Sequence, residues 1–294
     1  MKHHRVGLAA WLPLLLCVLA SCGAAPSPAA SSLTVMSFNI RNGKANDGDN
    51  SWANRRPLVS GVIGDYAPDV VGLQEAFRFQ LDQLAADLPA FVEVGEGRAG
   101  GVKDEYSAIL YRADRFELLS SGTFWLSDTP EVVSRHWGHH HYRVCTWARL
   151  RDVASGQALY VFNTHFDHQS QVARVNSAAL IRRRIREREF RDPVLVTGDM
   201  NAGESNPAIS QLKALGGSYP LRDSFRVVHP DAVNVGTGNG RYLGRRDGAK
   251  IDYILTSPEF QTIEATIDQD PRSGRFPSDH YPVIAQIVLQ AAAK

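Results

Sequence analysis

The sequence predicts an α/β fold in which two β-sheets pack face to face, with helices outside each sheet. Runs rich in β-branched and aromatic residues alternate along the chain with helical patterns. Some of these runs are continuously apolar, as in strands covered on both faces, whereas others alternate between apolar and polar residues. Two stacked sheets, each covered by helices on its outer face, satisfy both patterns.

The strands are expected in eight runs, and the helices between them. The strand-like segments are 33–40, 69–75, 107–112, 142–150, 158–165, 193–199, 251–255 and 281–289. Helical patterns cover 52–66, where apolar residues recur at 58, 59, 62 and 63, and 80–88, where leucines lie three and four residues apart. The longest helical pattern is 171–190, and its second half is rich in arginine.

The N-terminal segment predicts export. Residues 1–21 have a basic head, an apolar stretch too short to span a membrane comfortably, and small residues at the end, as in a signal peptide. The ending "LASC" resembles the lipobox of bacterial lipoproteins, which implies a lipid on Cys22, a lipid-anchored envelope protein and, because Gly23 follows, compatibility with the outer membrane. The alternative is an ordinary secretory signal cleaved near "GAA".

A short tether and one folded domain are expected after the signal. Residues 22–32 are small, uncharged and contain proline, as in a flexible tether. From 33 to 290 there is no second linker and no repeat, which predicts one domain, and we expect a monomer.

Loss of Lys2 and Arg5 with the signal leaves 30 basic residues of the original 32 against 31 acidic ones, a net charge of −1. That charge excludes a broad basic surface for nucleic acid. With Cys17 removed and Cys22 lipidated, only Cys145 remains, which we expect to be a buried, inert thiol.

Residues able to bind a cation or a phosphate stand at the ends of several predicted strands: Asn39, Glu75, His165, Asp199, Asn201, Asp252, Asp279 and His280. A lone Asn or Asp at a strand end is most often a turn former. A carboxylate at the mouth of a buried strand, such as Glu75, is costly without a partner and suggests a bound cation. Oxygen ligands without cysteine suit Mg²⁺ or Mn²⁺, and two histidines remain for proton transfer or hydrogen bonding. This set predicts phosphoester hydrolysis.

Six motifs resemble one family in order and separation. "FNIR", "PDVVGLQE", "NTHFDH", "GDMNA", "KIDYIL" and "SDHYPV" are similar to those of the endonuclease/exonuclease/phosphatase (DNase I-like) superfamily over residues 33–290. The resemblance implies a four-layer α-β-β-α sandwich and metal-dependent in-line attack of water on phosphorus. In particular, the chain looks like the exported bacterial branch called metal-dependent hydrolases.

The resemblance also implies roles for individual residues. Glu75 would be the main ligand of Mg²⁺ or Mn²⁺, with Asn39 and Asp279 nearby, directly or through water. Asp199 would orient or deprotonate the attacking water, and Asn201 would hold that water or the phosphate. His280, oriented by Asp252, would contact the phosphoryl oxygen. His165 would be a second donor to the developing charge, and Arg143 a cation facing the phosphate.

Two departures from the family pattern narrow the function. Arg41 replaces the aspartate of the DNA-repair nucleases, which argues against a repair enzyme. The aromatic residue that commonly follows the threonine before Asp252 is missing, so substrate contacts at Thr237 and Asn239 stay open.

Two further groups of residues have alternative interpretations. Histidines 136, 139, 140 and 141 could form a zinc site, although consecutive residues of an extended chain face opposite ways and a loop beside the groove is favoured. Arg245, Arg246 and Lys250 could meet a phosphate-rich ligand or lie in a solvated loop.

Three functions compete. The leading hypothesis is a metal-dependent phosphodiesterase or nuclease-like hydrolase of the cell envelope. The second is a sphingomyelinase-like phospholipid hydrolase, which would need an exposed apolar hairpin. The third is a non-catalytic binding lipoprotein, which would be expected to have lost motif residues that this chain retains.

Overall fold

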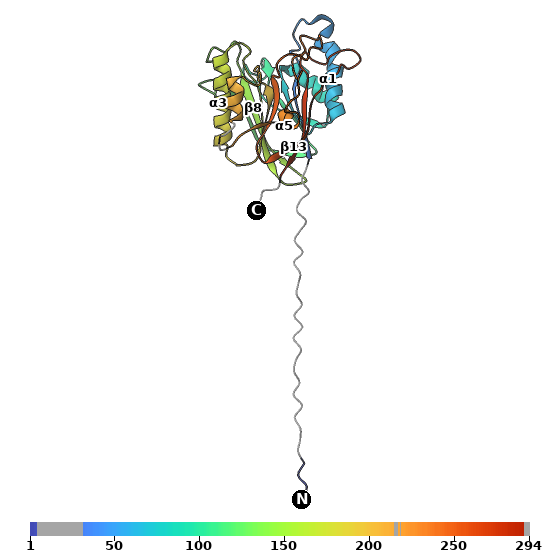
Figure 1. Ribbon diagram of the computed structural model, residues 1–294, viewed down its shortest axis with the longest axis vertical. Coiled ribbons are helices and arrows are strands. Elements are labelled where there is room, and N and C mark those ends of the chain that lie inside the picture. The colour runs from blue at the N-terminus through green and yellow to red at the C-terminus, as the bar shows by residue number, and fades with distance from the viewer. Residues whose placement is uncertain (5–31, 215–216, 218, 291–294) are drawn as a thin grey trace.

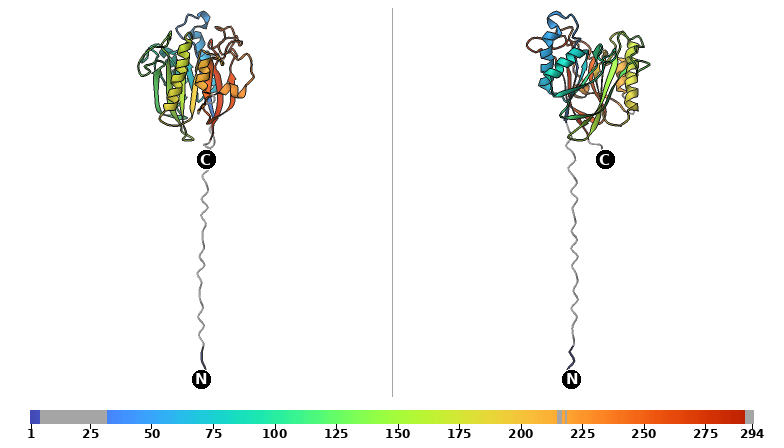
Figure 2. Two further views of the ribbon diagram at one scale, coloured as in Figure 1. Left: turned by 60° about the vertical axis from the view of Figure 1, so that its left-hand side comes forward. Right: turned by 180° about the vertical axis from the view of Figure 1, so that it is seen from behind.

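In the computed structural model, two six-stranded sheets lie face to face, and helices cover their outer faces. The structure describes residues 1–4, 32–214, 217 and 219–290, so Cys22, most of the signal and most of the tether lie outside the described residues. Figure 1 shows α3 (Gln171–Glu187) on one side of the sheets and α1 (Trp52–Tyr66) on the other, and the right-hand view of Figure 2 shows the same order of layers from behind. This is the predicted four-layer α-β-β-α arrangement.

The first sheet is assembled from both ends of the chain. Its strand order is β13-β14-β1-β2-β6-β4, and its members are β1 (Ser32–Asn39), β2 (Val70–Gln74), β4 (Phe91–Val94), β6 (Ile109–Arg112), β13 (Phe260–Ile267) and β14 (Val283–Leu289). β1 runs parallel to β2 and antiparallel to β14. Ser32, expected in the tether, is therefore the first residue of a strand.

The second sheet comes from one continuous segment. Its order is β11-β12-β10-β9-β8-β7, and its members are β7 (Phe116–Trp125), β8 (Val144–Asp152), β9 (Ala158–His165), β10 (Val194–Asp199), β11 (Arg222–Asp223) and β12 (Asp252–Thr256). β9 and β10 are parallel, and β12 is antiparallel to β10. The remaining elements are the short pair β3 (Ala76–Phe77) and β5 (Glu105–Tyr106), the 3-10 turn η1 (Gly48–Asn50), and helices α2 (Arg78–Asp87), α4 (Pro207–Lys213) and α5 (Ser224–Val228).

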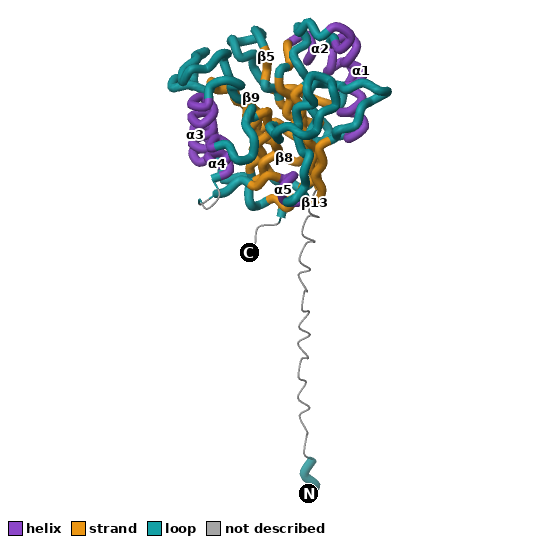
Figure 3. Tube along the Cα trace, turned by 45° about the horizontal axis from the view of Figure 1, so that its top comes forward, coloured by secondary structure: helices purple, strands orange, loops and turns teal. Residues whose placement is uncertain are grey.

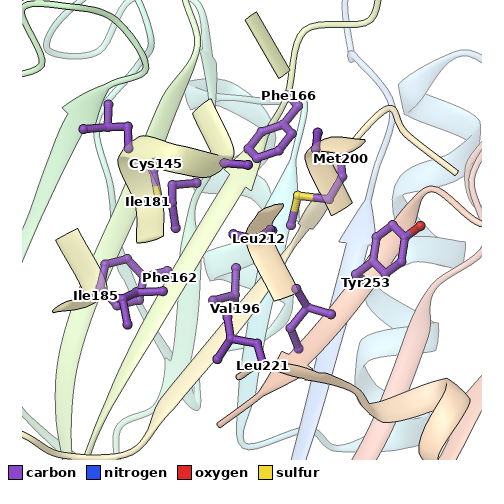
Figure 4. Packing of buried hydrophobic residues seen from close by; sticks show 14 of the residues in the cluster. Cys145, Phe162, Phe166, Ile181, Ile185, Val196, Met200, Leu212, Leu221 and Tyr253 are labelled. Atoms are coloured by element: carbon purple, nitrogen blue, oxygen red, sulfur yellow. The ribbon is translucent and has the colours of Figure 1, made fainter. Parts of the chain in front are cut away.

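Three apolar clusters lie between the four layers, one at each interface between neighbouring layers. Val35, Val161 and Ile254 belong to the cluster between the sheets. A second cluster joins the outer face of the first sheet to α1 and α2. The third joins the second sheet to α3 and α4, and Figure 4 shows Phe162, Ile181 and other side chains meeting there. Cys145 belongs to this cluster with no exposure, which agrees with the expected buried thiol.

A polar cross-link joins the two sheets just beneath the ends of the strands. Asn163 on β9 donates from Nδ2 to the carbonyl oxygens of Leu73 and Ala108, both at 2.8 Å. Its Oδ1 accepts from Gln74 Nε2 at 2.7 Å and from Thr197 Oγ1 at 3.0 Å. All four hydrogen-bonding positions of this buried amide are therefore filled, and the sheets are held in one register.

Predicted elements and observed ones differ mainly at the sheet edges. The runs expected to be strands correspond to β1, β2, β6, β8, β9, β10, β12 and β14, with ends shifted by up to two residues. The pattern missed β4, β7 and β13, which are the outermost or partly exposed strands, and the short helices α4 and α5. The second half of α3 is also not wholly solvated, because Arg182 is buried and donates to Tyr219 O. No helix in the described part of the chain is long and apolar enough to cross a bilayer.

Candidate active site

The strand ends deliver the predicted polar side chains to one edge of the sandwich. Asn39 is the last residue of β1, and Asp199 is the last residue of β10. In the second sheet Asp199 pairs with His165 on one side and with Asp252 on the other. Figure 3 turns this edge toward the viewer and shows loops and β5 around it.

Asn39 connects the carboxylates of the two sheets. Its Nδ2 donates to Glu75 Oε1 and to Asp199 Oδ2, both at 3.0 Å. Glu75 has a left-handed backbone (φ 62°), which turns its side chain toward Asn39, and its Oε2 accepts from the Asn42 amide at 2.8 Å. Glu75 and Asp199 are thus bridged by one side chain.

The role of Asn39 differs from a simple metal ligand. Its Oδ1 accepts from the Arg41 amide at 3.0 Å, while both protons of Nδ2 face carboxylates. An amide nitrogen does not ligate Mg²⁺, so direct ligation by Asn39 would require the amide to rotate. In this arrangement Asn39 positions Glu75 and Asp199.

Asp252, His280 and Asp199 form a buried chain of ionisable groups. His280 Nδ1 lies 2.9 Å from Asp252 Oδ2, and its Nε2 lies 3.8 Å from Asp199 Oδ2. Burial by itself lowers the pKa of His280, but Asp252 and Asp199 outweigh it and raise that pKa well above the ordinary value. Burial and the nearby Asp252 raise the pKa of Asp199 to about 7. The chain therefore places a charged imidazole beside a carboxylate that can exchange a proton near neutral pH.

His165 and Arg143 line the other side of Asp199. His165 Nε2 lies 3.4 Å from Asp199 Oδ2. Burial, together with Arg143 and Arg98, lowers the pKa of His165 well below its ordinary value, so its ring is neutral. Arg143 is 3% exposed and lines a small pocket with His165, Arg98 and Glu105.

Arg41 lies among the acidic residues on the opposite side. Its Nε is 3.7 Å from Asp279 Oδ2, and its Nη1 is 4.0 Å from Glu75 Oε2. Asp47 holds the guanidinium with two contacts, at 2.9 and 3.0 Å. Burial raises the pKa of Asp279, and the charge of Glu75 adds to this effect.

Buried polar residues outside the reacting set fix these loops. Arg55, on α1, donates from Nη1 to the carbonyl oxygens of Ile40 and Pro277, at 2.7 and 2.9 Å. Thr237 Oγ1 accepts from the amides of Ile251 and Asp252. Asn239 donates its backbone N–H to Asp279 O and its Nδ2 to Ser278 O. Thr237 and Asn239, left open by the sequence, therefore position Asp252 and Asp279.

Asn201 follows Asp199 in a left-handed conformation (φ 45°). Its amide donates to Asp199 Oδ1 at 2.9 Å, and its Nδ2 donates to Phe166 O at 3.0 Å. One N–H of Nδ2 is therefore used within the protein, whereas its second N–H can donate to a phosphate oxygen and Oδ1 can accept from a water molecule.

The donor set fits a hard divalent cation. Four carboxylates, on Glu75, Asp199, Asp252 and Asp279, converge at this edge, and Asp252 Oδ1 is buried without a hydrogen-bond partner. The ligand atoms of Asp199, Asp252 and His280 lie within 4.8 Å of one another. Because His280 is charged and already hydrogen-bonded to Asp252, the carboxylates of Glu75 and Asp279 are the better ligands for Mg²⁺ or Mn²⁺.

Other predicted groups lie elsewhere or take another role. Lys250 is not part of a phosphate-binding loop, because it is buried and pairs with Asp223 at 2.8 Å. Arg245 and Arg246 are exposed, and Arg246 contacts Asp270. In the described ranges, no three of the histidines 136, 139, 140 and 141 bring their nitrogens together as metal ligands.

Two residues of the site carried no signal in the sequence. Arg98 and Glu105 pair at 2.6 Å beside Arg143, and Asn42 Nδ2 donates to Glu105 Oε1 at 3.0 Å. Burial raises the pKa of Glu105 to about 7, although Arg98 opposes the change. Both residues come from the glycine-containing segment 95–107, which has no periodic pattern to mark it.

The family model described as the Endonuclease/Exonuclease/phosphatase family matches residues 36–280. The chain belongs to this family. Solved structures of family proteins have the same fold. A family protein of Bacteroides thetaiotaomicron superposes with a TM-score of 0.81 at 32% identity, covering 89% of this chain and 99% of that one.

Two further similarities concern named endonuclease/exonuclease/phosphatase proteins. A mannosyl-6-phosphatase of Bacteroides thetaiotaomicron superposes with a TM-score of 0.80 at 32% identity, covering 87% of this chain and 100% of that one. Nocturnin of Drosophila melanogaster is 25% identical in an alignment 287 positions long, which covers 81% of this chain and 42% of that protein. The chain spans about half the length of the curated relatives it matches.

Proposed function

We propose that the chain hydrolyses phosphoesters by in-line attack of water on phosphorus, with Mg²⁺ or Mn²⁺ as cofactor. The observation that carries this proposal is the Asn39 bridge. Its Nδ2 group donates to both Glu75 and Asp199, and so joins the carboxylates at the ends of the two sheets. It is supported by the acid–imidazole chain that ends at Asp199.

Asp199 is the residue that accepts the proton of the attacking water. Its Oδ1 is held by the Asn201 amide and its Oδ2 by Asn39 Nδ2, so the carboxylate is fixed in orientation. A pKa of about 7 suits a general base working near neutral pH. The water oxygen bonds to phosphorus, the phosphorus–oxygen bond to the leaving group breaks, and the leaving oxygen takes up a proton.

His280 and His165 supply hydrogen bonds to the developing charge. His280, charged and held by Asp252, donates from Nε2 to a phosphoryl oxygen, and neutral His165 donates from the other side of Asp199. A cation on Glu75 and Asp279 would offset the negative charge of the phosphate and polarise it. Arg143 lines the same pocket as His165, and its guanidinium is a cation that can face the phosphate.

The substrate class that we favour is a small phosphoester. The sequence favours a phosphodiesterase or nuclease-like enzyme, yet the net charge of the exported chain offers no basic surface for a long nucleic acid. The similar structure named mannosyl-6-phosphatase supports a compact ester. One observation supports the phospholipid alternative: Val102, in the segment that carries Arg98 and Glu105, and Val133, beside Gly100 of that segment, are 69% and 43% exposed.

A substrate panel tests the proposal. The full chain is assayed with and without Mg²⁺ on nitrophenyl phosphate, a nitrophenyl diester, a hexose 6-phosphate, DNA, RNA and sphingomyelin. We expect Mg²⁺-dependent turnover of at least one small ester, lost by at least about 1,000-fold in His280→Ala. His229→Ala, remote from the site, serves as the control. Turnover retained in a folded His280→Ala protein would overturn the mechanism, and absence of any turnover would favour the non-catalytic alternative.

We further propose that the protein is a lipid-anchored monomer of the cell envelope, exported and modified on Cys22. The support is the signal-like segment and its "LASC" ending. Labelling cells with a radioactive fatty acid tests this directly. We expect label and membrane association in the unaltered protein and neither in Cys22→Ser, whereas an unlabelled secreted protein would favour the ordinary secretory signal.

A further inference from the structure

Three histidine rings gather beside the candidate active site. The ring centroids of His140 and His141 are 4.5 Å apart, and both lie within 5.8 Å of the His168 ring. The His140 ring is nearly perpendicular to the other two, at 85° and 86°. We call these three side chains the imidazole fan.

The fan is fixed to the protein and adjoins the phosphate pocket. Asp167, a buried carboxylate, accepts from the His140 amide at 2.9 Å. Arg143 Nη2 lies 3.3 Å from His168 Nδ1, and Arg143 itself lines the pocket that contains His165. The fan therefore adjoins the proposed phosphate position through the contact between His168 and Arg143.

The positive charge of Arg143 favours an anion at the boundary between the imidazole fan and the pocket of His165. Its side chain is buried, and its Nε has no hydrogen-bond partner. Within the described ranges, no carboxylate oxygen lies within 4.0 Å of its guanidinium. A buried cation without a carboxylate in direct contact is unfavourable, and Arg98 adds a like charge, which the more distant Glu105 and Asp167 oppose. A phosphate next to His165 would supply the missing negative charge.

The fan itself offers neutral hydrogen-bonding groups. Burial, with Arg98 and Arg143 nearby, lowers the pKa of His141 to about 4, and burial and Arg143 lower the pKa of His168. A neutral imidazole has one donor and one acceptor nitrogen, which is also what a hydroxyl group needs. The fan is thus unsuited to a second anion. Its nitrogens also do not converge as metal ligands do, since the one such cluster among the described residues is that of Asp199, Asp252 and His280.

The ring geometry argues against a nucleobase. The two roughly parallel rings, His141 and His168, have centroids only 5.8 Å apart. A base inserted between them would need about 7 Å, two contact distances of about 3.5 Å. The edge of His140 also closes this space.

We propose that the imidazole fan is the subsite for a hydroxyl-rich leaving group, a sugar ring whose phosphate ester lies between Arg143 and His165. This rests on the proposed function, because it names the substrate class of the same site. The hydroxyl groups of the sugar donate to and accept from the nitrogens of His140 and His141, and the phosphate neutralises Arg143. The His168 ring, whose two nitrogens contact Arg143 and Gln169, lies against the sugar. Selectivity then resides in the leaving group, whereas nitrophenyl phosphate, which has no hydroxyl groups, uses the phosphate pocket alone.

The test compares two substrates across matched variants. In the full chain, His140→Phe and His141→Phe keep an aromatic ring and remove the nitrogens, and neither side chain contacts Arg143 by a hydrogen bond. We expect kcat/KM for mannose 6-phosphate to fall by about 10-fold or more in each, equivalent to about 1.4 kcal/mol. For nitrophenyl phosphate we expect a change of less than about twofold. His136→Phe, an exposed histidine of the same loop, is expected to change neither substrate.

The outcomes separate the subsite from the proposed function. Equal losses on both substrates would overturn the subsite, as would unchanged rates on mannose 6-phosphate. Unaltered protein that hydrolyses nitrophenyl phosphate but no hexose 6-phosphate would also overturn it, as would a preference for adenosine monophosphate over the hexose ester. Failure of the unaltered protein on every ester would instead refute the proposed function. Nitrophenyl phosphate turnover in each variant shows that it is folded.

Discussion

Replacing Asn163 by alanine should cost about 4 kcal/mol of the free energy of unfolding. The side chain makes four buried hydrogen bonds, to Leu73 O, Ala108 O, Gln74 Nε2 and Thr197 Oγ1. Some partners keep another contact: Ala108 O still accepts from the Leu73 amide, and Gln74 Nε2 still donates to Gly72 O. The cost of each lost bond is therefore nearer the usual net value of about 1 kcal/mol than the full penalty of an orphaned group.

Urea unfolding followed by circular dichroism measures this cost. Asn163→Asp keeps the shape but turns a donor into an acceptor facing two carbonyl groups, so we expect a loss at least as large as that of Asn163→Ala. Asn176→Ala, on the half-exposed face of α3, is the control and should change stability by less than about 0.5 kcal/mol. A loss below about 1 kcal/mol in Asn163→Ala, or a harmless Asn163→Asp, would refute the view that this amide holds the sheets together.

Three other predictions follow from single sites. Glu75→Gln should raise the Mg²⁺ concentration that gives half-maximal activity by at least about 10-fold, because a charged ligand is lost; an unchanged Mg²⁺ titration would count against Glu75 as a ligand. Asp167→Asn should destabilise the protein most at neutral pH. Burial raises the pKa of Asp167, but backbone N–H groups outweigh it and lower that pKa below 3.8 in the folded state, so this stabilisation is present above about pH 3.8 and is lost below it. Urea titrations at several pH values check it, and a difference that grew toward acid pH would contradict it. Cys145 should resist iodoacetamide in the native protein and react only in urea, because burial raises the pKa of its thiol; native labelling seen by mass spectrometry would disprove its burial.

The central strands were predictable because their residues are buried on both faces. β10 begins with the apolar run Val194–Val196, and all six of its residues are buried. The edge strand β7 was missed because Ser120, Ser121 and Gly122 interrupt its pattern, and its pairing with β8 shifts between Leu118 and Ser120. β13 was missed because most of its residues are exposed or partly exposed. Periodicity reports burial, so it fails where an edge strand meets solvent.

The site was predictable as a set of strand ends but not as a network. Glu75, Asp199 and His280 could be named from the motifs, whereas their connection through Asn39 depends on the left-handed turn at Glu75. Arg98 and Glu105 belong to an aperiodic segment, and only the pairing of β5 with β3 brings them to His165. Contacts between residues far apart in sequence are set by topology, which a local pattern does not contain.

The first sheet and the candidate site are completed by the same segment of the chain. The strand β14 lies between β13 and β1 within the first sheet, yet it follows both of them in sequence, and His280 lies three positions before its first residue, Val283. Until β14 has been inserted, the first sheet has a gap beside β1 and the acid–imidazole chain lacks its imidazole. A polypeptide that ends before His280 therefore lacks both the strand that closes the first sheet and the imidazole of the proposed mechanism, so one short segment completes the sheet and the candidate site together.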